Sequence, residues 1–206
     1  MSGPSPSRPQ SRPQLPLLIV VVVAVLLVGV AIVAAAVGDG AGPAALTVGS
    51  HRESQSALDA ELHSLAGSKA LADSLGSQGA ALSRSRGSIT SDIAAQWVSQ
   101  RVYGFVVADL LVRRHLTVTA ADRATAREQI GDAFLTGVST DVVHGFVDVN
   151  AGIAALTAQI GQDQVNTVVS DALRAAKVRI DARYGSWDAK LGQVCSPSGC
   201  PAPTSG

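Results

Sequence analysis

The chain has 206 residues and a balanced charge, with 16 Lys and Arg against 16 Asp and Glu. All 16 acids follow residue 38, where 14 basic residues remain, so this larger part is slightly acidic. A nucleic-acid partner would call for a concentrated basic surface, and this balance argues against one. Residues 39–206 suffice for one domain with a hydrophobic core.

The N-terminal region predicts a membrane anchor. Residues 1–16 are rich in proline, carry Arg8 and Arg12 and contain no acid, which is typical of a disordered tail. Residues 17–37 lack charged groups and are long enough, as a helix, to cross a bilayer. The basic flank places the N-terminus in the cytoplasm and the main domain outside the cell membrane, in a single-pass topology.

A cleaved signal peptide is the alternative to a permanent anchor. The apolar core of a signal peptide is usually shorter than this run, which favours the anchor. Small residues around Ala36 nevertheless suit cleavage, so this alternative stays open. Neither cysteine lies near the apolar run, which argues against a lipid-modified N-terminus.

The first elements after the membrane segment are short. Residues 38–44 are rich in Gly and Ala and predict a flexible linker. Residues 45–48 predict a strand that ends in a Gly-Ser turn. Ser54 is a candidate N-cap for a helix with an apolar stripe. That stripe consists of Leu58, Leu62 and Leu65.

Residues 89–116 form the longest regular stretch and predict the central helix of the core. Its main apolar face is marked by Val98, Val102, Phe105, Val112 and Leu116. The next helix begins at Thr119, where Asp122 three residues later predicts a capping box.

A strongly periodic helix follows and ends at Gly161. Its apolar positions are Val142, Phe146, Val149, Ile153, Leu156 and Ile160. Another amphipathic helix comes next, then a short strand at 178–181 and a turn at Tyr184-Gly185. The two predicted strands, one from each end of the domain, could pair and close it. The fold class is therefore mainly α.

No catalytic constellation appears in the sequence. It contains no Gly-rich phosphate loop, no nucleophile elbow and no paired-His metal helix. Asp59 and Glu61 point to different sides of one helix, so we expect both to be solvated. His115 and His144 have plain interpretations at a helix end and on a helix surface. We predict no catalytic residue, no metal site and no cofactor.

The two cysteines, Cys195 and Cys200, lie close together in a segment expected outside the membrane. In an oxidising compartment a short disulfide is the favoured state. Metal binding would need more ligands, and a redox-active pair more typically has a two-residue spacer. We place this disulfide in a disordered tail, residues 195–206.

The few aromatic residues have two possible roles. Trp97, Phe105, Phe134 and Phe146 could fill the helical core. Alternatively, one or two of them could line an apolar groove for extended polypeptide. The sequence does not separate these interpretations.

A terminal phrase gives the chain a resemblance to a known family. The segment "VRIDARYGSWDAKLGQV", together with "TVTAAD" at residues 117–122, resembles the N-terminal chaperone-like domain of SurA/PrsA-type extracytoplasmic foldases, in its actinobacterial form. The matching positions are Ile180, Asp181, Arg183, Tyr184, Gly185 and Trp187, while Ala182 stands where proline is common. The resemblance covers residues 45–194 and implies a helical domain that binds unfolded or exported polypeptides.

One departure from the family limits what the resemblance implies. Full foldases carry a parvulin-type prolyl isomerase domain, and no stretch of this sequence reads as one. The expected function is therefore chaperone-like binding without isomerase activity. The alternative is an envelope scaffold for one folded partner; an enzyme is the least favoured reading.

Overall fold

The computed structural model describes residues 42–77, 89–131 and 136–200, which form a mainly helical domain with two small antiparallel sheets. The predicted tail at 1–16 and membrane helix at 17–37 lie outside the described residues. Within the described part, no helix has the length and apolar character needed to cross a membrane.

The first sheet ties together the two ends of the domain. It contains β1 (Ala44–Val48), β2 (His51–Ser54) and β3 (Val178–Ile180) in the order β2-β1-β3. Thr47 pairs with Arg179, which confirms the predicted pairing of the two ends, and the structure shows that this pairing is antiparallel. The sheet has three strands instead of two, because a turn at Gly49, with φ of 57°, folds β2 back along the other edge of β1.

Six helices are described between β1–β2 and β3: α2 (Gln55–Ala66), α3 (Lys69–Ser77), α4 (Ser91–Arg113), α5 (Ala120–Ile130), α7 (Thr140–Ile160) and α8 (Gln162–Ala175). The predicted caps are confirmed. The Ser54 side chain accepts a hydrogen bond from the Ala57 N–H, and Thr119 and Asp122 form the reciprocal capping box. Gly161, with φ of 83°, ends α7 and precedes α8.

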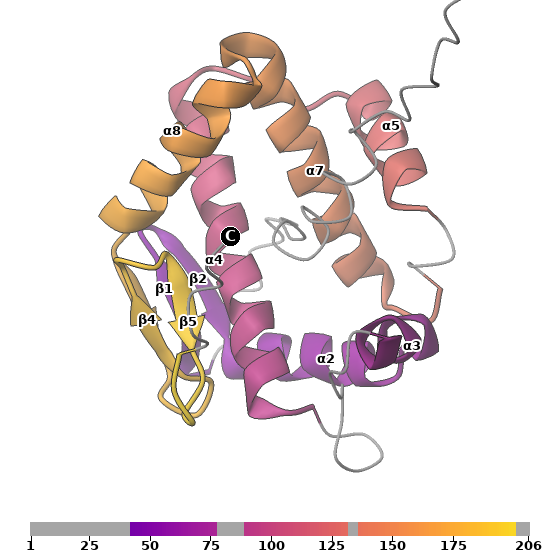
Figure 1. The fold of residues 1–206 in the computed structure, drawn as a ribbon, viewed down its shortest axis with the longest axis vertical. Helices are drawn as coiled ribbons and strands as arrows, with labels where there is room; N and C mark the ends of the chain where they lie inside the picture. The colour runs from indigo at the N-terminus through magenta and orange to yellow at the C-terminus, as the bar shows by residue number, and fades with distance from the viewer. Residues whose placement is uncertain (1–41, 78–88, 132–135, 201–206) are drawn as a thin grey trace, which may run out of the picture.

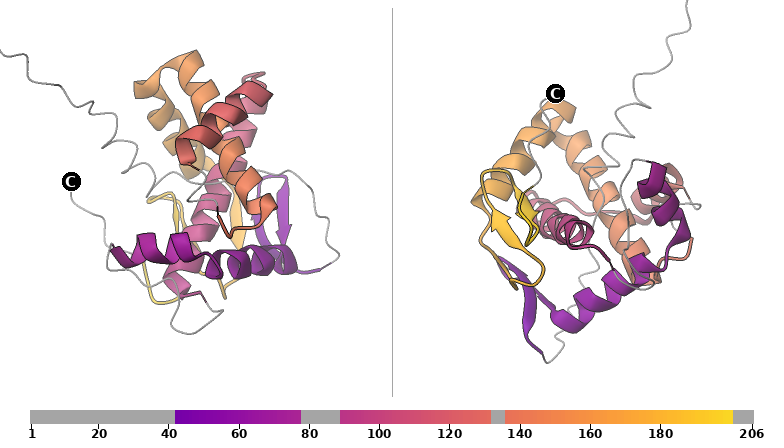
Figure 2. Two further views of the ribbon diagram at one scale, coloured as in Figure 1. Left: turned by 90° about the vertical axis from the view of Figure 1, so that its right-hand side faces the viewer. Right: turned by 60° about the horizontal axis from the view of Figure 1, so that its bottom comes forward.

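Helix α4 runs through the middle of the domain (Figure 1). It contacts α7, α8, β1 and the C-terminal strand β5 (Gln193–Cys195). The second view of Figure 2 looks nearly along α4, with the yellow C-terminal hairpin on one side and α7 on the other. Most of the predicted core positions of α4 are buried, which confirms its central role.

One predicted core position of α4 is wrong. Val112 is 73% exposed. Its neighbour Leu111 lies close to Gly152 of α7, where the two helices approach. One residue further along a helix with about 3.6 residues per turn, Val112 points away from that contact.

The second sheet is a C-terminal hairpin that the sequence analysis did not predict. It consists of β4 (Ser186–Asp188) and β5. Cys195 and Cys200 form the predicted disulfide, which is confirmed. Together with a bridge between Ser196 and Gly199, it holds residues 195–200 in a turn. The expected disorder of residues 195–206 is therefore wrong for 195–200; the remainder lies outside the described residues.

Candidate functional site: a groove between α4, α8 and the C-terminal hairpin

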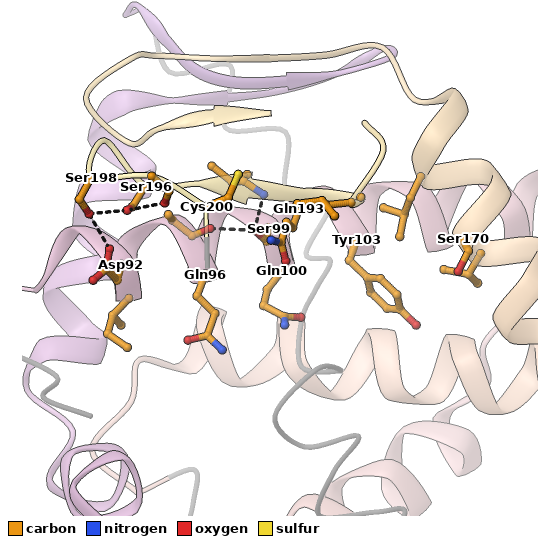
Figure 3. Close-up of a pocket in the computed structure, with 18 of the residues that line it drawn as sticks. Asp92, Gln96, Ser99, Gln100, Tyr103, Ser170, Gln193, Ser196, Ser198 and Cys200 are labelled. Atoms are coloured by element: carbon orange, nitrogen blue, oxygen red, sulfur yellow. Dashed lines mark hydrogen bonds between the residues drawn. The ribbon is translucent and has the colours of Figure 1, made fainter. Parts of the chain in front are cut away.

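A groove of about 860 Å³ lies between α4, α8 and the C-terminal hairpin (Figure 3). Its apolar lining comes from Ile93, Ala95, Val169, Leu173, Leu191 and Val194. Its polar lining includes Gln96, Ser99, Gln100, Tyr103, Asn166, Ser170, Gln193, Ser196 and Ser198. The groove therefore combines apolar surface with amide and hydroxyl groups.

The lining residues of α4 and α8 face the groove because their spacing in the sequence places them on one side of each helix. On α4, the lining residues Gln96, Ser99, Gln100 and Tyr103 occupy positions i, i+3, i+4 and i+7. The same spacing recurs on α8 from Asn166 to Leu173. Residues at these intervals lie on one face of a helix. The spacing of Gln96, Ser99 and Gln100 in the sequence was a signal for this polar stripe, although no groove was predicted from it.

Hydrogen bonds hold the hairpin in place as the third wall. The Val194 N–H donates to Ser99 Oγ at 2.7 Å, and Ser99 Oγ donates to the Ala95 carbonyl at 2.9 Å. At the far end of the groove, Ser198 Oγ donates to Asp92 Oδ1 at 3.0 Å (Figure 3). Ser99 therefore anchors one strand of the hairpin, while the disulfide-closed turn contacts the first turn of α4.

The groove is close to neutral. Asp92 is the one charged residue among the described residues that line it. Burial raises the pKa of Tyr103 to about 12, so its hydroxyl stays protonated at neutral pH and can donate a hydrogen bond. The described lining offers hydrogen-bond donors and acceptors, and it contains no His, Lys or Arg. The arrangement suits binding of a neutral, hydrogen-bonding ligand.

The aromatic residues singled out from the sequence lie elsewhere. Trp97, Phe105 and Phe146 are 7%, 4% and 5% exposed and belong to the hydrophobic core. The Trp97 and Phe146 rings are 5.4 Å apart between centroids. None of these three lines the groove, and in this conformation none is accessible to a polypeptide. The core interpretation therefore fits them, whereas Phe134 lies outside the described residues.

A buried ionic cluster on the other side of α4 was not foreseen. Arg101 Nε lies 2.8 Å from Glu53 Oε2 and 3.5 Å from Glu61 Oε2. The Trp97 Nε1–H donates to Glu61 Oε2 at 3.0 Å. The expectation that Glu61 is solvated is wrong, because α2 carries its side chain against α4. Asp59 is exposed and accepts a hydrogen bond from the Tyr184 hydroxyl at 2.6 Å.

Burial dominates the electrostatics of this cluster. The net effect of its surroundings raises the pKa of Glu61 to about 7; removal from water is the largest cause, and the negative charge of Glu53 acts in the same direction. The Arg101 guanidinium and the Trp97 hydrogen bond act in the opposite direction and lower this pKa. The cluster is buried between α2 and α4, and none of its residues lines the groove.

A possible metal-binding cluster contains the two cysteines of the disulfide. Donor atoms of Asp188, Cys195 and Cys200 lie within 4.8 Å of one another, and the described residues contain no other such group. Both sulfur atoms are used by the disulfide. A thiolate is the form that binds a metal, so these residues do not hold one in the oxidised protein.

Comparisons of this chain with protein-family models, with curated proteins and with solved structures find no match.

Proposed function

We propose that this chain is a membrane-tethered, extracytoplasmic protein of the chaperone type, which binds unfolded or exported polypeptides without isomerising them. The resemblance of residues 45–194 to foldase chaperone domains motivates the proposal. The observation that carries it is the groove, a neutral site with apolar surface and amide walls.

The chemistry of the groove matches that of an extended polypeptide. A peptide backbone offers N–H donors and C=O acceptors in alternation, and the Gln and Asn amides can satisfy both. The apolar lining from Val169, Leu173 and Val194 offers contact for side chains of the peptide. A volume of about 860 Å³ falls within the range of ordinary ligand pockets, so it accommodates a short peptide stretch.

Tethering would complement weak binding. An anchor at residues 17–37 holds the domain next to the bilayer, where exported chains emerge. A site held near its ligand sees a raised effective concentration, so low affinity for each short stretch suffices. Low charge in the groove also suits many sequences instead of one, because no strong ion pair selects the ligand.

A scaffold for one folded partner is the second candidate. Leu191, at the edge of the groove, is 46% exposed, and a folded partner could cover it. Crosslinking followed by identification of the bound proteins separates the two proposals. Many unrelated partners support the chaperone, and one stoichiometric partner supports the scaffold.

The decisive experiment measures peptide binding by the full chain in lipid nanodiscs. Fluorescence anisotropy with labelled unfolded peptides gives the affinity. Asn166→Trp places a large side chain in the groove and should weaken binding by about tenfold, equivalent to about 1.4 kcal/mol. Thr167→Trp, on the next and exposed position of α8, is the matched control and should bind like the wild type.

Both positions are exposed, so neither variant should change the melting temperature much. A wild-type chain that neither binds such peptides nor delays the aggregation of a reduced, unfolding protein contradicts the proposal. Equal weakening by Asn166→Trp and Thr167→Trp would place the binding site outside the groove.

A further inference from the structure

The buried cluster joins three elements and contains two acidic side chains but one basic side chain. Glu53 comes from β2, Glu61 from α2 and Arg101 from α4. The side chains of Glu53, Arg101 and Glu61 are 4%, 10% and 16% exposed. Two carboxyl groups thus share one guanidinium in a place where water reaches poorly. Fully ionised, the cluster would carry an uncompensated buried negative charge, which is costly.

One oxygen atom of the cluster lacks a partner. Glu53 Oε2 accepts from Arg101, but Glu53 Oε1 is buried and accepts no hydrogen bond from any described residue. The side chains of Glu53 and Glu61 also interact directly. A proton on Glu61 would supply the missing donor and remove the excess charge. A carboxyl–carboxylate hydrogen bond of this kind is strong because one partner is ionised.

We propose that Glu53, Glu61 and Arg101 form a proton-controlled latch between α2 and α4. While the two carboxyl groups share a proton, α2 stays docked against Trp97. When the proton leaves, repulsion between the carboxylates loosens α2. The aromatic pair of Trp97 and Phe146 then becomes accessible. This proposal does not depend on peptide binding in the groove.

The groups that act on Glu61 are few and identified. They are Arg101 and Trp97 on α4 and Glu53 on β2. On α7, Phe146 packs against Trp97 and bears no charge. His51 of β2 stacks on Phe105, over which the Arg101 guanidinium lies at 5.2 Å, and it hydrogen-bonds to Asp109. On α2 itself, Asp59 contacts Tyr184 and Arg183 instead of the cluster.

The direction of the pH effect follows from proton binding. The pKa of Glu61 rises from 4.5 to about 7 on folding, so between these values the folded chain holds a proton that the unfolded chain has lost. Stability therefore falls as the pH rises through this window and levels off above about pH 7. Loss of the proton is expected to weaken the docking of α2 first, since Glu61 lies on that helix.

Release is local because other contacts still hold α2. Leu58 and Leu65 remain buried in the core. The Ser139 N–H donates to Ser64 Oγ at 2.7 Å, which ties the far end of α2 to the start of α7. The loosening should therefore appear as faster local opening, not as global unfolding.

The experiment uses the full chain in nanodiscs with Trp187→Phe, which leaves Trp97 as the tryptophan reporter. Acrylamide quenching of Trp97 and hydrogen exchange of α2 are measured at about pH 5.5 and about pH 8.5, on either side of the window. Quenching should rise severalfold at the higher pH. Exchange of α2 should also rise severalfold after correction for intrinsic chemistry, whereas α8 should change little.

Two neutralising variants and one control isolate the cluster. Glu61→Gln keeps an acceptor for Trp97 and gives Glu53 a permanent donor, so the pH dependence of α2 should disappear. Glu53→Gln should also remove it, because Glu61 is then left alone with Arg101. Glu128→Gln, at an exposed glutamate of α5, should behave like the wild type. Because histidines titrate in the same range, the difference between wild type and variant is the quantity to use.

The proposal is wrong if Glu61→Gln retains the wild-type pH dependence. It is also wrong if exchange of α2 and quenching of Trp97 are the same at both pH values in the wild type. Should Glu61→Gln fail to fold, Glu53→Gln decides: persistence of the pH dependence in that variant overturns the latch.

Discussion

The two sides of α4 both carry polar residues, yet they are used in opposite ways. On one side Arg101 is buried with Glu53 and Glu61 beneath α2. On the other, Gln96 and Gln100 line an open groove, and Asp92 at its end is the one charged residue among the described lining residues. The ionisable side chains are buried, and the neutral amides line the open groove. On a simple amphipathic helix the ionisable side chains would be the exposed ones.

The difference separates a buried, structural side from the side that we propose binds a ligand. A buried charge stays ionised only with a partner at close range, so each member of the cluster fixes the position of the others. Amides at the surface of a groove cost little in water and can exchange hydrogen bonds with a ligand. Substitutions in the buried cluster should therefore lower the free energy of unfolding. Substitutions at the groove should mainly change the shape of the groove and its affinity for a ligand.

The largest loss of stability is expected from Arg101→Met, which disrupts the buried ionic cluster. Removal of the guanidinium leaves two buried carboxyl groups without a counterion, and breaking such a buried pair costs about 3–5 kcal/mol. Urea unfolding of the full chain in nanodiscs measures this loss. Arg174→Met is the control, because Arg174 and its partner Asp171 are 59% and 67% exposed and such a pair contributes about 1 kcal/mol or less. Equal losses in the two variants would show that the cluster has no special role.

Gly185→Ala should lower stability by disturbing β5 of the hairpin that forms one wall of the groove. Gly185 has a φ of 127°, and an added Cβ would lie 2.1 Å from the Cys195 carbonyl oxygen. The backbone has to move, which displaces β5 from α4 at a cost of about 3 kcal/mol. Thermal unfolding measures the cost, and exchange of the Val194 N–H reports on its bond to Ser99. Gly131→Ala also has a positive φ but no nearby atom, so it controls for backbone strain alone. A similar loss in both variants would exclude the clash as the cause.

A smaller effect is expected from replacing Cys195 and Cys200 together with serine. The disulfide closes a short loop, so its removal should lower the free energy of unfolding by about 2 kcal/mol. The turn with Ser198 should then detach from Asp92 and widen one end of the groove, which peptide affinity would detect. Reduction of the wild type with dithiothreitol should reproduce the change, and the double variant should not respond. Unchanged peptide affinity would show that this turn is not part of the binding side.

Local features of the fold were predictable from the sequence. The Ser54 cap, the Thr119–Asp122 capping box and the stop at Gly161 each depend on residues within one turn of the chain. The β1–β3 pairing was also predictable, because two β-branched runs stood at the ends of a helical sequence. The disulfide followed from the short spacing of Cys195 and Cys200.

The remaining features depend on contacts between distant segments. Glu61 becomes buried because Trp97 and Arg101 reach it from another helix. The β4–β5 hairpin was missed because its strands are three residues long and carry little apolar periodicity. The groove was not predicted, because Gln96, Ser99 and Gln100 of α4 line it while the aromatic residues Trp97 and Phe105 of the same helix lie in the core.

The order of the strands in the first sheet has a consequence for how the chain folds. A hairpin of β1 and β2 is a local structure and can form within microseconds once both strands are free. The other edge of β1 is filled only by β3, which lies near the opposite end of the domain. Closing so long a loop is slow, and an unpaired strand edge can meanwhile pair with another chain. Until Val178–Ile180 arrive, the newly made protein is itself exposed to misassembly through the edge of its first strand.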